Sequence, residues 1–451
     1  MAETIYALAS GGAKAGIAVI RLSGPSAGEV VRALTPGAPF PAPRRAVRRV
    51  FRHPQSGRAL DDGLALWFPG PRSYTGEDAA ELHIHGGRAV RAALLDALAA
   101  LPGCRLAEPG EFTRRAFLND RLDLSQAEGV VDLIEAETEA QRRQALRQAE
   151  GALGRRCAAW AERLMRLAAH AEAWIDFPDE DLPAESRDRN EFEMQQLEAE
   201  LTQEIEGSVR SERLRDGVRV AIVGPPNAGK SSVLNRLAGR EAAIVHARAG
   251  TTRDVVEVGL DLAGVPVVAA DTAGLREAAD EIEAEGVRRA RAAAAAADVV
   301  VCVAAVTDPA APALWTDARA AYPEAAVLLV ANKSDLLTQD AAASGIGGAA
   351  GEPVLFVSAQ TGAGIEVLVD RLAAAAAEAA GAGEEAGLTR ARHREAAAEC
   401  LAALRRARRA PSPDLEAEDL RLALRAIGRI TGKVDVEDLL DVVFRDFCIG
   451  K

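Results

Sequence analysis

The chain has 451 residues, which suggests roughly three domains and excludes a single small folded unit. Hydrophobic residues make up 49% of it and aromatic residues only 4%, so we expect globular cores built mostly from aliphatic side chains. The formal net charge of -13 argues against wholesale electrostatic wrapping of nucleic acid. Any RNA partner must therefore be held by a local basic patch.

The cysteines and the start of the chain indicate a compartment. The cysteines are scattered, without a CxxC pair or the spacing of zinc ligands, which argues against a disulfide scaffold or a structural zinc site. No run near 18 apolar residues occurs, and the opening MAETIYALASGG lacks a basic segment followed by an apolar one. We therefore expect a cytoplasmic protein without membrane association. The cysteines are Cys104, Cys157, Cys302, Cys400 and Cys448.

Residues 1–118 alternate short β-branched runs with turns, which predicts an α+β domain. Six arginines and no acidic residue lie between Arg44 and Arg58. We favour a solvated edge hairpin protected by its charge, and a contact with phosphate or RNA is the alternative. His83 and His85 share one strand face, but no third metal ligand is evident, so we interpret them as pocket wall or hydrogen-bonding groups. The predicted strands are GIAVIRLSG, LALWFPGP and ELHIHGG.

Helical periodicity begins near Ser125, which with Glu128 has the spacing of a capping box. Long helices are predicted across residues 119–214, and helical periodicity returns in residues 381–451. The Ala- and Gly-rich stretch at 373–387 is interpreted as a linker or a weakly packed helix end. These patterns predict one helical domain built from two sequence segments.

An α/β domain with a parallel sheet is predicted between the two helical segments, at residues 217–380. Apolar β-type runs alternate there with helical stretches. The runs are VRVAIVG, VPVVAADTAG, DVVVCVAAV, AVLLVANKSD and PVLFVSAQ.

The first of these strands leads into a phosphate-binding loop. Gly224, Gly229, Lys230 and Ser231 fit the pattern GxxxxGKS between a strand and a helix. Glycines let backbone N–H groups turn toward phosphate oxygens, the lysine neutralises β- and γ-phosphate charge, and the serine hydroxyl ligates Mg²⁺.

Three further loops complete a guanine-nucleotide site. The aspartate of DTAG (271–274) ends a strand where it can hold the Mg²⁺ shell, and the glycine N–H can meet the γ-phosphate. In NKSD, the Asp335 carboxylate can accept two hydrogen bonds from the amino side of guanine, which adenine lacks. The loop Ser358–Gln360 is predicted to close over the base. These signals in this order predict a GTPase.

Several motifs resemble one family of enzymes. GPPNAGKS, AGTTRD, DTAGLRE and NKSD resemble the bacterial translation-factor-related GTPases. The segments LWFPGPRSYTGEDAAELHIHGG, PGEFTRRAFLNDRLDLSQAE and FCIGK narrow the resemblance to the tRNA uridine-modification GTPases, MnmE/TrmE. The resemblance implies an N-terminal folate-binding, dimerising domain, a helical domain and an inserted Ras-like P-loop GTPase domain.

The resemblance also implies a reaction and its partners. Such a homodimer, with an FAD-dependent partner protein, adds an aminomethyl or carboxymethylaminomethyl group to C5 of the wobble uridine of certain tRNAs. A 5-formyl- or methylene-tetrahydrofolate is expected to carry the one-carbon unit. The folate-binding positions implied are Arg21, Glu81, Arg121 and Lys451, and position 121 is usually lysine in the family.

Cys448, in FRDFCIGK, has two interpretations. It is either a catalytic thiol near the folate and target base, or a buried small hydrophobic residue beside Phe444 and Phe447.

Hydrolysis of GTP needs a water-positioning group, and Leu275 after DTAG has no hydrogen-bonding atom. The resemblance assigns this role to Glu283, and it assigns K⁺ to Asn227 with His246, Arg248 and Thr251 of the switch segment. Mg²⁺ is expected on Ser231 and Thr252. The GTP-binding residues implied are Asn227, Ala228, Gly229, Lys230, Ser231, Ser232, His246, Ala247, Arg248, Ala249, Gly250, Thr251, Thr252, Asp271, Thr272, Ala273, Gly274, Asn332, Lys333, Asp335, Ser358, Ala359 and Gln360.

The alternative function is a regulatory switch, such as a ribosome-assembly or RNA-binding GTPase without covalent chemistry. That class is expected to carry a basic KH-like module with a GxxG loop. The acidic balance and the predicted N-terminal domain do not supply one.

Overall fold

The computed structural model describes residues 3–176, 184–239, 243–244, 257–271, 292–337, 353–381, 387–434, 440 and 450. It divides into two compact units, one of residues 1–131, 149–162 and 424–451, and the other of residues 132–148 and 163–423. Within the described ranges, no helix is long and apolar enough to cross a membrane.

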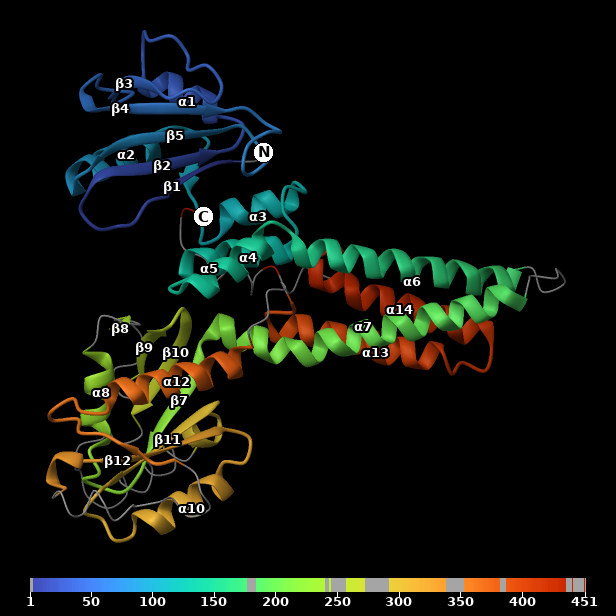
Figure 1. The fold of residues 1–451 in the computed structure, drawn as a ribbon. Helices are drawn as coiled ribbons and strands as arrows, with labels where there is room; N and C mark the ends of the chain where they lie inside the picture. Colours follow the sequence, from blue (N-terminus) through green and yellow to red (C-terminus); the bar gives the residue numbers. More distant parts are fainter. Residues whose placement is uncertain are drawn as a thin grey trace, which may run out of the picture. The chain divides into compact units, whose positions relative to one another are not determined.

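The N-terminal residues form a six-stranded sheet in the order β3-β4-β5-β2-β1-β6, with β3 at one edge (Figure 1). Side chains along β2 alternate between buried and more exposed, so one face of the sheet packs with α1 (Ala27–Leu34) and α2 (Arg88–Ala99) in a common core. The predicted α+β arrangement is therefore confirmed. The strands are β1 (Thr4–Leu8), β2 (Ala15–Ser23), β3 (Val47–Arg52), β4 (Ala59–Phe68), β5 (Ala79–Gly86) and β6 (Cys104–Leu106).

A buried carboxylate joins β6 to α3 (Glu111–Leu118). Glu111 is 8% exposed and accepts hydrogen bonds from Arg105 at 2.6 and 2.8 Å, from Arg115 at 3.0 Å and from the backbone N–H of Glu108 at 2.9 Å. Burial alone would raise the pKa of Glu111, but the hydrogen bonds from Arg105, Glu108 and Arg115 outweigh it and lower the pKa.

Glu111→Gln is expected to reduce the local stability of β6 and α3 by about 2 kcal/mol at neutral pH, because Arg105 and Arg115 lose the carboxylate that they share and keep Glu3 and Glu77 respectively. Since the folded-state pKa is lowered, the contribution of this group is present above the unfolded pKa and is lost as pH falls through the folded value. Amide hydrogen exchange in β6 and α3 should therefore differ between wild type and variant at pH 7 and converge in acid. The exposed Glu108→Gln serves as control and should change exchange little.

The helix α4 (Leu124–Glu135) is capped two residues earlier than the predicted capping box. Asp123 accepts the N–H of Gln126 at 2.8 Å, and the Gln126 side chain accepts the N–H of Asp123 at 3.0 Å. The cap is therefore the pair Asp123 and Gln126, while Ser125 lies inside the helix and donates to Asp123 at 2.6 Å. The prediction was wrong because an aspartate two positions earlier caps equally well, with Gln126 at the required spacing.

Long helices follow, as predicted, and return near the C-terminus. They are α5 (Glu139–Ala149), α6 (Ala152–Asp176), α7 (Ala184–Asp216), α13 (Ala391–Ala407) and α14 (Pro413–Thr431). Figure 1 shows α7 and α13 side by side, and ion pairs join them, including Glu198 with Arg405 at 2.7 Å.

The inserted segment forms a seven-stranded sheet in the order β13-β12-β11-β7-β10-β9-β8. The predicted parallel pairing holds from β13 to β10, but β9 and β8 are antiparallel additions that the sequence analysis did not predict. The strands are β7 (Val218–Val223), β8 (Ala243–Ile244), β9 (Glu257–Leu262), β10 (Val265–Asp271), β11 (Val299–Ala305), β12 (Ala326–Asn332) and β13 (Leu355–Phe356).

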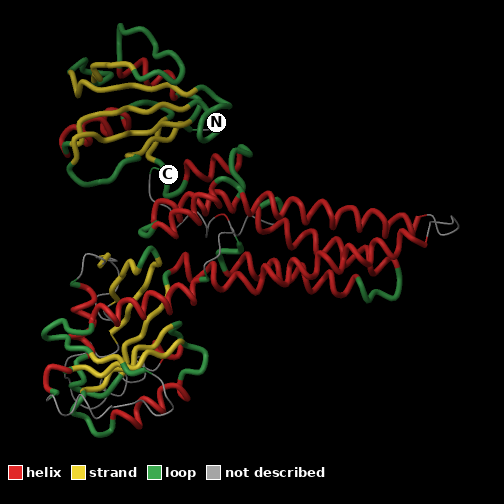
Figure 2. Tube along the Cα trace, in the orientation of Figure 1, coloured by secondary structure: helices red, strands yellow, loops and turns green. Residues whose placement is uncertain are grey.

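Helices pack on both faces of this sheet (Figure 2). On one face Val299, Val301 and Val303 of β11 share a core with α8 (Lys230–Ala238) and α12 (Ile365–Ala380), and on the other Cys302 packs with α10 (Ala311–Ala321). The helix α12 corrects the interpretation of 373–387 as a linker or weakly packed helix end for residues 373–380, while residues 382–386 lie outside the described residues. Its last residues, Ala376 and Ala380, are buried, because small side chains let the helix lie close to the sheet.

The two ends of the inserted segment meet at the end of α7. Arg213 forms an ion pair with Asp298 at 2.6 Å and donates to the carbonyl of Ala379 at 3.4 Å. Gly381 has a φ of +69° and lies against Arg210, where a Cβ would come within 2.7 Å of the arginine Cδ. The inserted segment therefore leaves and returns to the helical segments at neighbouring points.

Candidate functional site

The phosphate-binding loop connects the central strand β7 to α8. Its two glycines have positive φ angles of 149° at Gly224 and 91° at Gly229. A Cβ on Gly224 would come within 1.9 Å of the Val303 carbonyl oxygen, and one on Gly229 within 2.3 Å of the Asn332 side chain. Both positions therefore require glycine for the backbone path as well as for space.

The loop presents its functional groups at the first turn of α8. Asn227 has a φ of 63°, a left-handed conformation that asparagine tolerates better than most residues. Lys230 is the first helical residue, and its Nζ donates to the carbonyls of Gly224 at 2.9 Å and Pro225 at 3.0 Å. The lysine charge and the helix N-terminus are thus held over the same loop, which suits an oligophosphate.

The loops after β12 and β13 are joined to the phosphate-binding loop by Asn332. This side chain is 2% exposed; it donates to the Ala228 carbonyl at 2.9 Å and accepts the Ala359 N–H at 3.1 Å. Ser358 donates to Asp335 Oδ1 at 2.5 Å. These bonds bring together three segments that are far apart in the sequence, at the carboxyl ends of parallel strands where α/β folds bind ligands.

Other predicted nucleotide contacts lie outside the described residues. The structure shows the backbone of Asp271 as the last residue of β10, in register with Ile222 of β7. The switch segment 246–252, the rest of the DTAG motif at 272–274 and Glu283 fall in the undescribed ranges.

A second cluster of polar groups lies on the face of the N-terminal sheet opposite α1 and α2. Arg21 of β2 and Glu81 of β5 are directly opposite each other in the register, and their ion pair measures 3.1 Å. Glu81 also bonds His83 Nε2 at 3.3 Å. The Arg21 guanidinium lies 5.5 Å from the Tyr74 ring centre and 5.9 Å from that of Phe112, so cation and carboxylate stand beside two aromatic faces.

Tyr74 and Phe112 were not among the predicted site residues. Burial raises the pKa of Tyr74, and its hydroxyl pairs with Thr113 at 2.8 Å. Tyr74 lies in the SYTGED segment that carried the family resemblance, so that motif could have pointed to it.

Of the other two predicted folate residues, the structure describes Arg121 and not Lys451. Arg121 is exposed, and its side chain passes Gly76, in the same loop as Tyr74. Gly450 packs its backbone against Leu8 of β1, where a Cβ would come within 2.2 Å of the carbonyl oxygen. Since Ala7 of β1 pairs with Arg21, the end of the chain reaches the neighbouring strand. Lys451 and Cys448 are outside the described residues.

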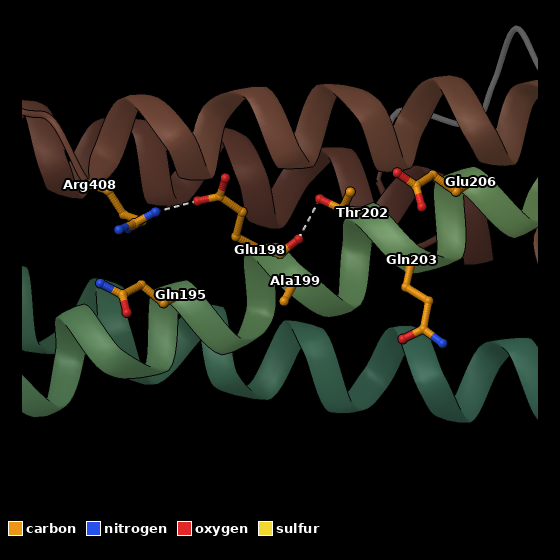
Figure 3. A pocket seen from close by; sticks show the side chains of 7 residues that line it. All are labelled: Gln195, Glu198, Ala199, Thr202, Gln203, Glu206 and Arg408. Carbon is orange, nitrogen blue, oxygen red and sulfur yellow. Dashed lines mark hydrogen bonds and ion pairs between the residues drawn. The ribbon is translucent and has the colours of Figure 1, made fainter.

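A groove along α7 is one concave surface near charged groups (Figure 3). Its Arg408 points to Glu198, and the same arginine bonds Glu191 at 2.6 Å. Charges in the groove are therefore matched within the helical segment, and it contains none of the predicted site residues. Its lining is Gln195, Glu198, Ala199, Thr202, Gln203, Glu206 and Arg408.

A phosphate-binding loop on the central strand, tied to a base-reading loop, defines a P-loop GTPase, a GTP hydrolase. Residues 4–121 match the family described as GTP-binding protein TrmE N-terminus, and residues 124–448 match the MnmE helical domain. The chain belongs to the MnmE family of tRNA modification GTPases.

Full-length relatives agree with this assignment. The chain is 57% identical over 453 residues to the tRNA modification GTPase MnmE of Parvibaculum lavamentivorans, covering 100% of both chains. It is 55% identical over 454 residues to the protein of the same name from Paramagnetospirillum magneticum, again covering 100% of both. The Rhodospirillum rubrum protein of that name is 54% identical, with 100% of this chain and 99% of the relative covered.

Proposed function

We propose that this chain is a K⁺-stimulated GTPase that modifies tRNA together with an FAD-dependent partner protein. The product is an aminomethyl or carboxymethylaminomethyl group on C5 of the wobble uridine of certain tRNAs, with a tetrahydrofolate supplying the one-carbon unit. The observation that carries the proposal is the Arg21–Glu81 pair beside Tyr74 and Phe112, in a chain that also holds a guanine-nucleotide frame.

The chemistry of the N-terminal cluster suits a folate. Glu81 offers carboxylate oxygens to the N–H groups of an amino-pyrimidine ring, and Tyr74 offers a flat apolar face to it, while the buried Phe112 ring lies against the Arg21 guanidinium. Arg121 and Lys451 supply cations for the acidic folate tail, and Arg121 would present a planar fork in place of the usual lysine ammonium. Residues 1–118 would form this folate-binding, dimerising domain, and the helical segments 119–214 and 381–451 would flank the GTPase domain at 217–380.

The GTPase site would hold two metal ions. Mg²⁺ suits the Ser231 hydroxyl in the first turn of α8, with Thr252, and K⁺ suits the Asn227 side chain with His246, Arg248 and Thr251. The cation would neutralise charge on the phosphates, while Glu283 orients the attacking water. Asn227 fits because its left-handed backbone holds it within the phosphate-binding loop.

Arg21→Ala and Glu81→Ala are each expected to abolish tetrahydrofolate binding and leave GTP turnover nearly unchanged, since the pair lies on a different sheet from the nucleotide loops. Titration of 5-formyltetrahydrofolate into the full chain, followed by fluorescence, measures the first effect, and phosphate release measures the second. Arg88→Gln, an exposed substitution on α2, is the control. Normal folate affinity in both variants would contradict the site.

Reconstitution tests the whole reaction. The chain, the FAD-dependent partner, GTP and folate labelled in its one-carbon group are expected to transfer the label to tRNA uridine. Cys448→Ser should keep GTP hydrolysis and lose the transfer if the thiol is catalytic, whereas full transfer would make it a buried hydrophobic residue.

A further inference from the structure

Strand β3 lies at the free edge of the N-terminal sheet (Figure 1), and the sequence of β3 and of the loops beside it is rich in arginine. The β3–β4 hairpin confirms the predicted edge hairpin. We call a set of these arginines the arginine edge. It consists of Arg44, Arg45, Arg49, Arg52, Arg58 and Arg72.

Charges on the arginine edge are not neutralised by carboxylates within the part of the chain that the structure describes. Arg49 donates to the carbonyls of Arg48 at 2.8 Å and Pro39 at 2.6 Å, Arg52 donates to Gly57 at 3.0 Å, and Arg44 donates to Arg72. A carbonyl acceptor orients a guanidinium group and leaves its net charge in place. Arg48, by contrast, is paired with Asp62 and lowers the pKa of that carboxyl, so we exclude it from the set.

Several arginines of the helical segments, by contrast, form ion pairs with carboxylates. Arg408, which follows α13, pairs with Glu198 (Figure 3), and Arg405 of α13 pairs with the same carboxylate. Arg163 of α6 pairs with Glu193 and Glu200. In a chain with a net charge of -13, acidic partners are plentiful, so an uncompensated row of arginines is a local exception.

Two features of the arginine edge are strained or unsatisfied. Arg44 has a φ of 58°, a left-handed conformation that is unfavourable for a residue with a Cβ. The Nε of Arg49 is buried without a hydrogen-bond partner among the described residues. A single exposed charge is enough to protect a sheet edge from aggregation. Edge protection therefore explains neither the backbone conformation of Arg44 nor the unpaired Nε of Arg49.

We propose that the arginine edge docks the phosphate backbone of RNA. The six residues of β3 span about 20 Å at about 3.3 Å per residue, with further arginines at both ends, which is enough for several consecutive phosphates. Guanidinium groups bind phosphate oxygens through two parallel N–H donors, and contacts with phosphates position a nucleic acid without reading its bases. The inference rests on the proposed function, in which tRNA is the substrate, and it adds the surface to which that tRNA binds.

The test uses three arginines whose side chains make no bond to a described residue: Arg45, Arg58 and Arg72. The triple variant Arg45→Gln, Arg58→Gln, Arg72→Gln removes three charges without disturbing the fold. The matched control carries Arg88→Gln, Arg371→Gln and Arg425→Gln, which are exposed positions elsewhere. Binding of an unmodified tRNA transcript to each full chain is measured over a series of KCl concentrations, beside basal GTP hydrolysis.

The edge variant is expected to bind tRNA at least about tenfold more weakly at low salt, with the slope of log affinity against log salt reduced by about 2. The control should lose little, and GTP hydrolysis should be unchanged in both. Lysines at the same three positions should restore most of the salt slope, since the charge is kept.

An edge variant with wild-type affinity and slope would overturn the docking surface. So would a variant that keeps tRNA affinity but no longer co-migrates with the FAD-dependent partner, because the surface would then bind an acidic protein. A wild-type chain without salt-dependent tRNA affinity also overturns it, whereas folate binding and label transfer decide the proposed function separately.

Discussion

Replacing Asp335 with asparagine is expected to weaken GTP binding by at least about a hundredfold and to shift the preference toward xanthosine triphosphate. Two hydrogen bonds from guanine N–H groups to a carboxylate are worth about 1.5–3 kcal/mol each. Ser358 already donates to Oδ1 of Asp335, so the new amide nitrogen is expected at the outer position, facing the base. That amide would repel the guanine amino group and bond the carbonyl of xanthine.

Competition between GTP and XTP for the full chain measures the shift. Asp370→Asn, an exposed carboxylate on α12 in the same segment, is the matched control and should leave both affinities unchanged. If the Asp335 variant keeps the wild-type ratio of GTP to XTP affinity, the base is read elsewhere.

The second large effect is expected at Glu283, whose replacement by alanine should lower kcat for GTP hydrolysis by about a hundredfold at nearly unchanged nucleotide affinity. The residue after DTAG, Leu275, has no hydrogen-bonding atom to position water, and the proposed function gives this role to Glu283. Single-turnover hydrolysis and nucleotide titration separate the two quantities. Glu281→Ala is the control, because it removes a neighbouring carboxylate from the same acidic stretch; an equal loss there would assign the effect to charge.

The same assay in KCl and NaCl tests the cation. Wild-type hydrolysis should be faster in K⁺, and Asn227→Gly should lose the difference, since glycine removes the side-chain oxygen and accepts the left-handed φ of 63° without strain. Equal rates of GTP hydrolysis by the wild type in KCl and NaCl would contradict the proposed role of K⁺.

The phosphate-binding loop could be predicted from sequence patterns because its residues are close together in the chain. Gly224, Gly229 and Lys230 lie within one loop, and their spacing alone defines the phosphate cradle. The antiparallel strand β9 was missed, although its Val258, Leu260 and Leu262 alternate. Its turn to β10 is Ala263–Gly264, with φ angles of 54° and 87°, and alanine is an uncommon residue for that conformation.

The N-terminal cluster was only half predicted, for a different reason. Arg21 and Glu81 came from motifs, but their neighbours Tyr74 and Phe112 converge from distant parts of the chain. Their contact with Arg21 depends on strand order and on the path of one loop, which no local pattern specifies. The arginine edge shows the converse case, since composition located it and the structure then showed that its guanidinium groups bond carbonyls and no carboxylate among the described residues.

The GTPase segment connects α7 to α13. The contacts of Arg213 with Asp298 and Ala379 hold the start of this segment close to its end while it is folded. If residues 217–380 unfolded, bringing the two helices together would require closing a long flexible loop, at an entropic cost of about 4 kcal/mol. A nucleotide at a hundred times its Kd adds about 2.7 kcal/mol to the folded segment by mass action. The GTP concentration in the cell therefore also sets how firmly this pair of helices resists heat and proteases.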